Sequence, residues 1–222
     1  MAAALTRLAA YQFPVSLNDT TRAYFLAQAE MASPDVAADM RAVVADPTND
    51  EAAQRLWTAN PSWNGMLRTT CVATQFDGGH APNALPQRAK VNVNCRILPG
   101  VPMEQVRADL IRVIADDAIS VNFGDERGLP APAPPLTAEM LDPIRAIAKT
   151  LWPEARVVPT MATGATDGRF LNAAGTPTYG ISGVFADAAG SGAHGLNERI
   201  RVQSLLDARQ FLHELVKSYT RH

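Results

Sequence analysis

The sequence is short of the groups that build the simplest functional sites. Only two cysteines and four histidines occur among its 222 residues. Two cysteines are too few for a disulfide scaffold or a thiolate zinc site, and we expect Cys71 and Cys95 to be small buried side chains. The nucleophile motif G-x-S-x-G and the metal motif H-E-x-x-H are absent. These absences exclude a serine hydrolase with that nucleophile motif and a metalloprotease with that metal motif.

Charge and long apolar runs are also scarce. Charged residues make up 19% of the chain and leave a net charge of −2. A near-neutral chain has no bulk attraction to nucleic acid or to an anionic membrane, so we expect neither as a partner. No apolar run approaches the ~20 residues of a membrane span. Arg7 interrupts the apolar start, which argues against a secretory signal and favours a cytoplasmic location.

What the chain does contain is enough apolar material for a sizeable core. Hydrophobic residues make up 47% of the chain, and the length fits one large domain or two small ones. The spacing of apolar residues predicts a helix over 1–11 and further helices between 18 and 58. Pairs such as Ser33-Pro34 and Asn60-Pro61 mark helix boundaries. We interpret the segment from about 18 to 62 as a helical insertion.

The pattern then changes to the two-residue period of strands. Residues 67–76 predict one strand and 88–98 a second, joined by a long loop. In the second strand one face carries Val91, Val93, Cys95 and Ile97, and the other carries Lys90, Asn92, Asn94 and Arg96. A helix over 103–114 and a short strand over 119–123 complete this part. Helix, strand, strand, helix, strand predicts an incomplete ferredoxin-like (split βαβ) domain over 1–127 that lacks its first strand.

The segment 128–135 reads GLPAPAPP, and its four prolines indicate a stiff linker between domains. Beyond it, 136–222 predicts helices over 140–151, 167–173 and 205–219 with strands over 156–160 and 178–181. Two strands are too few for a covered parallel sheet. We therefore expect an α/β chain whose core needs further polypeptide upstream.

His194 is the most distinctive candidate for chemistry. It lies between Gly192 and Gly195 in AGSGAHGLNERI, where small residues let the backbone approach a ligand closely. The imidazole is either a metal-binding or catalytic group or a loop residue that makes an ordinary hydrogen bond. A single histidine cannot hold a catalytic zinc, which takes three or more protein ligands.

Two further polar groups are candidates for binding an anionic ligand. The turn TGATDGRFL opens into a helix, and Arg169 offers a bidentate donor for a carboxylate, unless Asp167 caps the helix and pairs with Arg169. Arg96 shares a strand face with two asparagines, and His80 and Asn83 occupy the loop one strand away. These residues form either a polar cluster or a solvated outer face.

Three segments together resemble one family. They are NALPQRAKVNVNCRILPG, ATGATDGRFL and GAHGLNERI, in this order along the chain. They resemble the acetylornithine deacetylase, succinyl-diaminopimelate desuccinylase and glutamate carboxypeptidase family of dinuclear-zinc aminoacylases and exopeptidases. The resemblance implies that residues 136–222 are the C-terminal part of a zinc-peptidase-type α/β catalytic domain. It also implies that residues 1–127 are a lid that carries the dimer contact.

The resemblance also assigns roles to residues. His194 matches a zinc ligand of the family. The residues that match its substrate-binding positions are Asn83, Arg96, Gly164, Thr166, Asp167 and Arg169. The family's H-x-D motif, bridging aspartate and paired glutamates lie upstream of the lid and have no counterpart here, so no catalytic residue is assigned.

The function that this resemblance implies is part of a dinuclear-zinc amide hydrolase. Such an enzyme, a metallo-exopeptidase or N-acyl amino acid deacylase, acts on N-acyl amino acids or small peptides and forms a homodimer through the lid. Two zinc ions occupy a complete site, and this chain supplies at most one ligand, so we expect it to be inactive without the upstream half. The alternative is a non-catalytic dimerisation or small-ligand-binding module derived from the same family.

Overall fold

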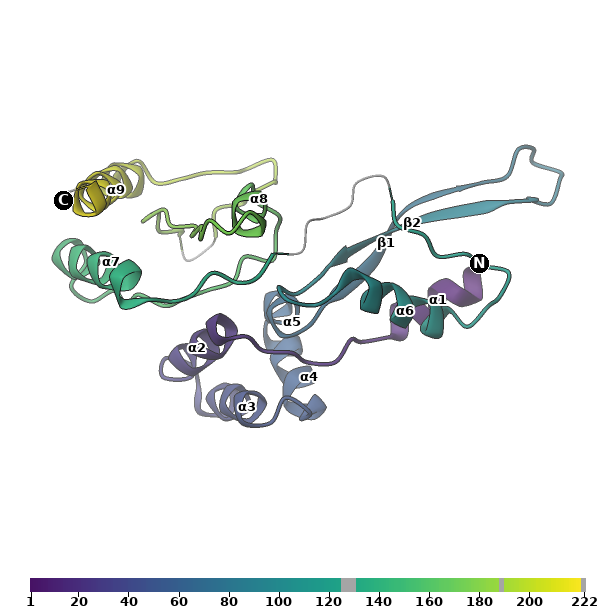
Figure 1. Cartoon of the computed structure of the whole chain (residues 1–222), viewed down its shortest axis with the longest axis horizontal. Coiled ribbons are helices and arrows are strands. Elements are labelled where there is room, and N and C mark those ends of the chain that lie inside the picture. Colours follow the sequence, from purple (N-terminus) through teal and green to yellow (C-terminus); the bar gives the residue numbers. More distant parts are fainter. Residues whose placement is uncertain (125–130, 188–189, 221–222) are drawn as a thin grey trace. The chain divides into compact units, whose positions relative to one another are not determined.

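Helices account for most of the regular structure in the computed structural model, which describes residues 1–124, 131–187 and 190–220 (Figure 1). In chain order the elements are α1 (Ala2–Ala10), α2 (Asp19–Gln28), α3 (Pro34–Ala45), α4 (Asp50–Ala59), α5 (Pro61–Leu67), β1 (Thr70–Gly78), β2 (Ala89–Arg96), α6 (Met103–Ile114), α7 (Ala138–Leu151), α8 (Gly168–Ala173) and α9 (Val202–Thr220). The chain divides into two compact units, Met1–Ala133 with Pro159–Thr176, and Pro134–Val158 with Pro177–His222. No helix of the described residues has both the length and the apolar character needed to cross a membrane.

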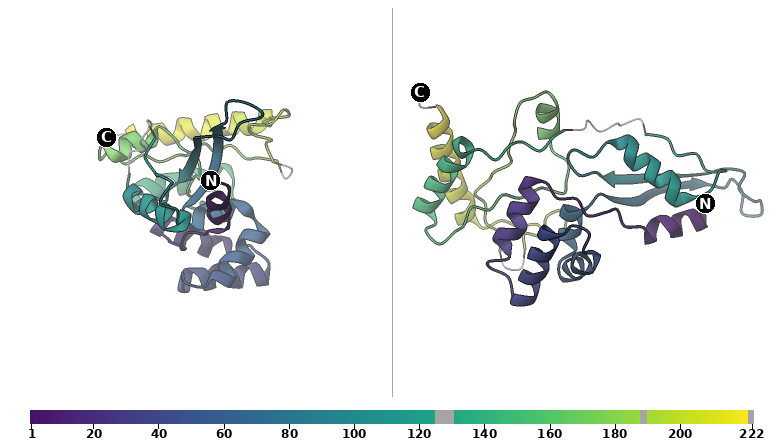
Figure 2. Two further views of the ribbon diagram at one scale, coloured as in Figure 1. Left: turned by 90° about the vertical axis from the view of Figure 1, so that its right-hand side faces the viewer. Right: turned by 60° about the horizontal axis from the view of Figure 1, so that its bottom comes forward.

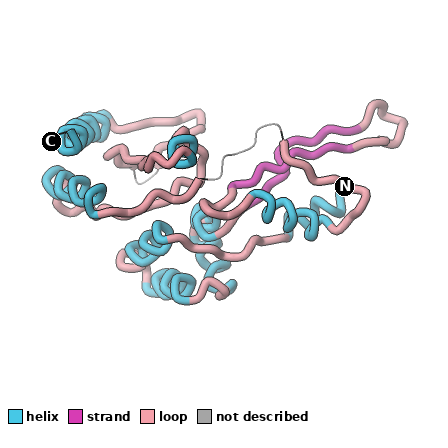
Figure 3. The backbone as a smooth tube through the Cα atoms, in the orientation of Figure 1, coloured by secondary structure: helices cyan, strands magenta, loops and turns pink. Residues whose placement is uncertain are grey.

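The first unit contains a β-hairpin. β1 and β2 pair antiparallel, with Cys71 opposite Cys95 and Val72 opposite Asn94, and they run side by side along the length of the hairpin (Figure 3). In β2 the side chains alternate between half-buried and exposed, as the two-residue period predicts. The predicted inward face of Val91, Val93 and Cys95 is therefore confirmed.

α1 and α6 run beside the hairpin and bury its inward face (Figure 2). Leu8 of α1 and Val106 and Leu110 of α6 form the hairpin cluster together with Phe13, which follows α1. Half-buried strand residues such as Val93 and Ile97 pack against it. Arg112 of α6 also donates a hydrogen bond to the Tyr11 hydroxyl at 3.0 Å, which ties α6 to the chain just after α1.

Helices α2 to α4 lie within the predicted insertion, and α5 extends it past the expected end at residue 62; local sequence signals explain where they begin. The Asn18 side chain accepts a hydrogen bond from the Thr21 amide in a capping box at the start of α2. Pro34 and Pro61 occupy the first turns of α3 and α5, where the missing amide proton costs nothing. Each signal acts within one helical turn, so the sequence alone locates these helices.

The insertion has a core of its own. This insertion cluster comprises Phe25, Ala29, Ala37, Met40, Val43, Ala52, Ala53, Leu56, Met66 and Leu67. It shares no buried residue with the hairpin cluster. Met161, from the segment 159–176, packs against the insertion cluster, and a Cβ placed on Gly65 would lie 3.1 Å from Cγ2 of Thr163. The segment that contains the turn TGATDGRFL is thus seated on α5.

The second unit is built around α7 and α9. Ile144 and Ala148 of α7 pack with Phe211 and Leu215 of α9. The Trp152 ring meets Phe185 edge-on at 4.9 Å between centroids, which extends this core beyond the helices. The Tyr219 hydroxyl donates to the carbonyl of Met140 at 2.5 Å, and burial raises the pKa of that phenol.

Three predicted strands are wrong. In the described residues, segments 119–123, 156–160 and 178–181 do not form strands, and β1 and β2 pair only with each other. A strand needs a neighbour to receive its hydrogen bonds, which the residue pattern of a segment cannot supply. Segment 119–123 is held instead by the Arg107 side chain, whose Nε donates to the Val121 carbonyl at 2.7 Å. Part of the predicted linker, 128–130, lies outside the described residues.

The expectation for the cysteines is also wrong. Cys71 and Cys95 are half-buried and joined by a disulfide bond. Their pairing follows from the strand register, which places the two residues directly opposite each other.

Candidate functional site

The open face of the hairpin carries Arg96. This side chain lies at the end of β2, opposite Thr70, on the exposed face that α1 and α6 leave uncovered. Asn92 and Asn94 share the face. In the described residues the Arg96 guanidinium has no hydrogen-bond or ion-pair partner, so it is available to an anionic ligand.

Asn83 lies at the opposite end of the same hairpin. It is exposed in the loop between β1 and β2, beyond the tip of the paired strands (Figure 3). The eight residues of β2 at about 3.3 Å each separate this loop from Arg96 by roughly 25 Å. The structure therefore does not bring His80 and Asn83 beside Arg96, and the predicted polar cluster does not form within one chain.

A β-bulge, which the sequence did not reveal, changes the face pattern of β1. The pairing skips one residue between Ala73 and Gln75. Asn92 stabilises the bulge because its Nδ2 donates to Oγ1 of Thr74 at 2.8 Å. Beyond the bulge, Gln75 lies opposite Asn92 and Phe76 opposite Val91. Phe76 is thereby moved to the inward side, although it stays 67% exposed.

The turn TGATDGRFL presents the other predicted substrate-binding residues to solvent. Gly164, Thr166, Asp167 and Arg169 are all exposed. Asp167 makes no side-chain hydrogen bond to the start of α8 in the described residues, so the capping interpretation is wrong. The Arg169 guanidinium lies 4.6 Å from the ring centroid of Phe170. This cation–π contact involves one face of the guanidinium, and its N–H donors stay available to a ligand.

His194 lies in a tight loop of the second unit. Its backbone φ is +64°, a left-handed conformation that few residues other than glycine adopt. The Gly195 amide donates to the Gly192 carbonyl at 2.8 Å, and the Arg199 amide donates to the Ser191 carbonyl at 2.8 Å. Gly192 is required here because a Cβ at this position would lie 2.9 Å from the Asn197 carbonyl oxygen. The loop thus displays an exposed imidazole.

The described residues do not make a complete metal centre. They contain no group of three or more His, Cys, Asp or Glu side chains placed to hold an ion. His194 belongs to the second unit, and the other six predicted site residues belong to the first. A dinuclear metal site does not fit the donors that this chain supplies by itself.

Arg68 is a buried charge that the sequence did not single out. It is only 4% exposed and lies at the junction of α5 and β1. Its Nη1 donates to Oε1 of Gln12 at 2.6 Å, which ties the insertion to the segment after α1. Burial lowers the pKa of this guanidinium, and the nearby Asp50 carboxylate opposes that shift. Its role is structural, because it connects elements within the first unit.

Comparison with known proteins identifies the class. Residues 1–122 match the family model described as the M20 peptidase dimerisation domain, and the chain belongs to this family. This confirms the resemblance to the zinc-dependent aminoacylases and carboxypeptidases with a lid, and the α/β lid fold. The terms hydrolase, metallopeptidase, carboxypeptidase and dimerisation domain therefore describe its family.

Individual relatives come from animals, an amoeba and an archaeon. The chain is 28% identical over 168 residues to the human N-fatty-acyl-amino acid synthase/hydrolase PM20D1, covering 74% of this chain and 33% of that protein. It is 24% identical over 165 residues to the probable carboxypeptidase S-like 2 of Dictyostelium discoideum, covering 74% and 32%. The crystal structure of the M20 family metallo-carboxypeptidase Sso-CP2 from Sulfolobus solfataricus matches with a TM-score of 0.55 at 16% identity, over 98% of this chain and 52% of that one. The chain spans about a third of the length of the curated relatives it matches.

Proposed function

We propose that this chain is the lid and the C-terminal part of the catalytic domain of a metal-dependent amide hydrolase. In this proposal residues 1–127 form the lid, 128–135 the linker and 136–222 the catalytic segment. The observation that carries the proposal is the match of residues 1–122 to the M20 dimerisation domain. The unpaired Arg96 on the open face of the hairpin supports it, since a lid must present polar groups to a substrate.

The substrate that these residues favour is an N-acyl amino acid or a small peptide. Both contain a carboxylate close to an amide, and the exposed guanidinium groups of Arg96 and Arg169 are suited to bind a carboxylate. The name of the PM20D1 relative describes an N-fatty-acyl-amino acid, and the other two relatives are named as carboxypeptidases or carboxypeptidase-like. Asn83, Gly164, Thr166 and Asp167 complete the proposed set of substrate contacts.

His194 is proposed to be one ligand of a dinuclear zinc site. Bound zinc polarises an amide carbonyl and lowers the pKa of water. This chain contributes the imidazole, and a carboxylate base and the remaining ligands come from the N-terminal part of the catalytic domain that the longer relatives have room for. The imidazole is exposed, as that role requires.

The first consequence is that this chain hydrolyses nothing by itself. Purified chain supplied with zinc or cobalt is expected to show no turnover of N-acyl amino acids above the blank, because it lacks the general base and most metal ligands. The measurement is release of free amino acid over several hours. Turnover that survives repurification and disappears in His194→Ala would contradict the proposal.

The second consequence concerns assembly. We expect the chain to form a homodimer through the lid, because an exposed hairpin presents an edge that needs pairing or cover. Light scattering at micromolar concentration should give about twice the 23.8 kDa of one chain. A chain that stays monomeric at micromolar concentration would show that the dimer contact does not form in this part of the protein.

A further inference from the structure

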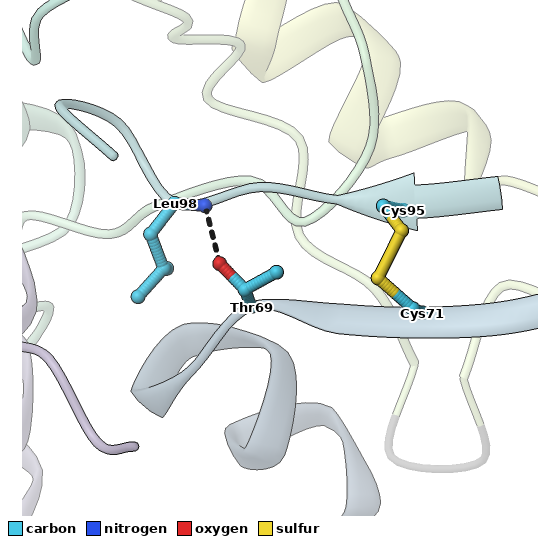
Figure 4. The surroundings of a disulfide bond; sticks show 4 residues. All are labelled: Thr69, Cys71, Cys95 and Leu98. Carbon is cyan, nitrogen blue, oxygen red and sulfur yellow. Dashed lines mark hydrogen bonds between the residues drawn. A yellow bond between two sulfur atoms is a disulfide. The ribbon is translucent and has the colours of Figure 1, made fainter. Parts of the chain in front are cut away.

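The disulfide bond crosses the hairpin at its base. Cys71 of β1 and Cys95 of β2 lie directly opposite each other, with Cα atoms 4.1 Å apart (Figure 4). The short separation is typical of the closely spaced, non-hydrogen-bonded pairs of an antiparallel ladder. Close by, the amide of Leu98 donates to Oγ1 of Thr69 at 3.3 Å, so the strands are connected on the α5 side of the disulfide as well.

Both cysteines belong to the interface between the hairpin and two helices. They are half-buried and pack against the hairpin cluster of α1 and α6. The insertion cluster of α2 to α5 has a separate set of buried residues. The disulfide therefore lies in one of two independent cores of the first unit.

The crosslink adds to the little that holds the two strands together. A two-stranded hairpin is marginally stable in water unless it packs against a helix; in the described residues β1 and β2 pair only with each other and depend on their packing against α1 and α6. The bulge between Ala73 and Gln75 interrupts the ladder two residues beyond Cys71. A crosslink over 24 residues removes loop entropy from the opened hairpin and so favours the closed one.

We propose that Cys71 and Cys95 form a redox clamp. As a disulfide they hold β1 and β2 in register against α1 and α6. Reduction by a dithiol loosens the hairpin and these two helices, and α2 to α5 stay folded. Arg96 directly follows Cys95, so the clamp also controls the position of that guanidinium. Only this last consequence rests on the proposed function.

The chemistry balances with a dithiol as the reductant. A thiolate of the dithiol attacks one sulfur, the Cys71–Cys95 bond breaks, and the released cysteine thiolate takes up a proton. The second thiol of the reductant then attacks the mixed disulfide and releases the other cysteine. Two electrons and two protons pass to the protein, and the reductant becomes a disulfide. Oxidation by glutathione disulfide reverses the exchange.

The state of the clamp depends on the redox conditions of the compartment that holds the protein. Disulfides persist in oxidising compartments, and the cytosol keeps thiols reduced. The clamp is therefore closed in an oxidising compartment and open in a reducing one such as the cytosol.

Hydrogen exchange of the full chain, followed by mass spectrometry, tests the clamp. One sample is equilibrated with glutathione disulfide and the other with dithiothreitol, and thiols are counted in denaturant. We expect no free thiols in the first sample and two in the second. After reduction, the exchange rate of amides in β1, β2, α1 and α6 should rise on the order of 100-fold. A rise of about tenfold is the smallest that the proposal allows. Amides of α3 and α4 should not change.

The variant Cys71→Ser/Cys95→Ser serves as the matched control. It should show the exchange pattern of the reduced chain under both conditions. Two free thiols in the sample treated with glutathione disulfide would overturn the proposal, as would unchanged exchange in the hairpin. Loss of protection in α3 and α4 together with the hairpin would show one cooperative unit and would also overturn it. If the double variant does not fold, the two wild-type samples still decide between these outcomes.

Discussion

Phe25→Ala is expected to lower the free energy of unfolding of the insertion by about 3–5 kcal/mol. Phe25 is fully buried in α2 and belongs to the insertion cluster together with Met40, Leu56 and Leu67. Truncation removes the buried ring and leaves a cavity that the surrounding helices cannot fill completely. Most buried side chains of this core come from α2 to α5, so the loss of one large ring weakens the insertion itself.

Leu26→Ala is the matched control for this substitution. Leu26 is the next residue of α2, but its side chain is 48% exposed. Both variants introduce alanine, which favours the helix, so the difference between them reports burial. Leu26→Ala should cost no more than about 1 kcal/mol, because surface substitutions have small effects.

Urea unfolding, followed by the fluorescence of Trp57 and Trp63 in α4 and α5, measures both values. A Trp152→Phe background removes the only other tryptophan, which lies in the second unit. Equal losses in the two variants would contradict the separate core of the insertion. A loss below about 1 kcal/mol for Phe25→Ala would contradict its full burial.

Arg96→Ala is expected to lower kcat/KM by roughly 10- to 150-fold in an enzyme that combines this chain with the N-terminal catalytic segment. The figure corresponds to the ~1.5–3 kcal/mol of a hydrogen bond to a charged group. Arg96 is exposed and has no partner among the described residues, so its removal should leave the melting temperature unchanged. A loss of binding without a loss of stability is the signature of a substrate contact.

Lys90→Ala is the control for Arg96→Ala. Lys90 lies on the same face of β2, near the tip and opposite Asp77. It carries the same charge, so a general electrostatic effect on an anionic substrate would reduce kcat/KM equally in both variants. Steady-state kinetics and thermal unfolding on each variant separate the possibilities. A lower melting temperature with unchanged kinetics in Arg96→Ala would show that Arg96 serves the fold.

How far the sequence predicts this fold depends on the range of the interaction concerned. The capping side chain of Asn18 and Pro34 act within one helical turn, and the helices they begin lie in the segment that was predicted to be helical. Pro61 was recognised only as a boundary, and the helix that it begins, α5, was not predicted. The alternation along β2 is equally local, since it follows from the two-residue period of the strand. Strands 119–123, 156–160 and 178–181 were predicted wrongly because a strand exists only beside a partner.

For the candidate site, the sequence by itself determined which side chains are candidates and which family they resemble. It located His194 between small residues and Arg96 on a polar strand face, because these features are contained in a few neighbouring positions. Only the tertiary structure decided how they are arranged. The strand register brought Cys71 and Cys95 together across 24 residues, and the length of the hairpin set Asn83 apart from Arg96. Both outcomes depend on how one strand pairs with another, and the pattern of a single strand does not contain that information.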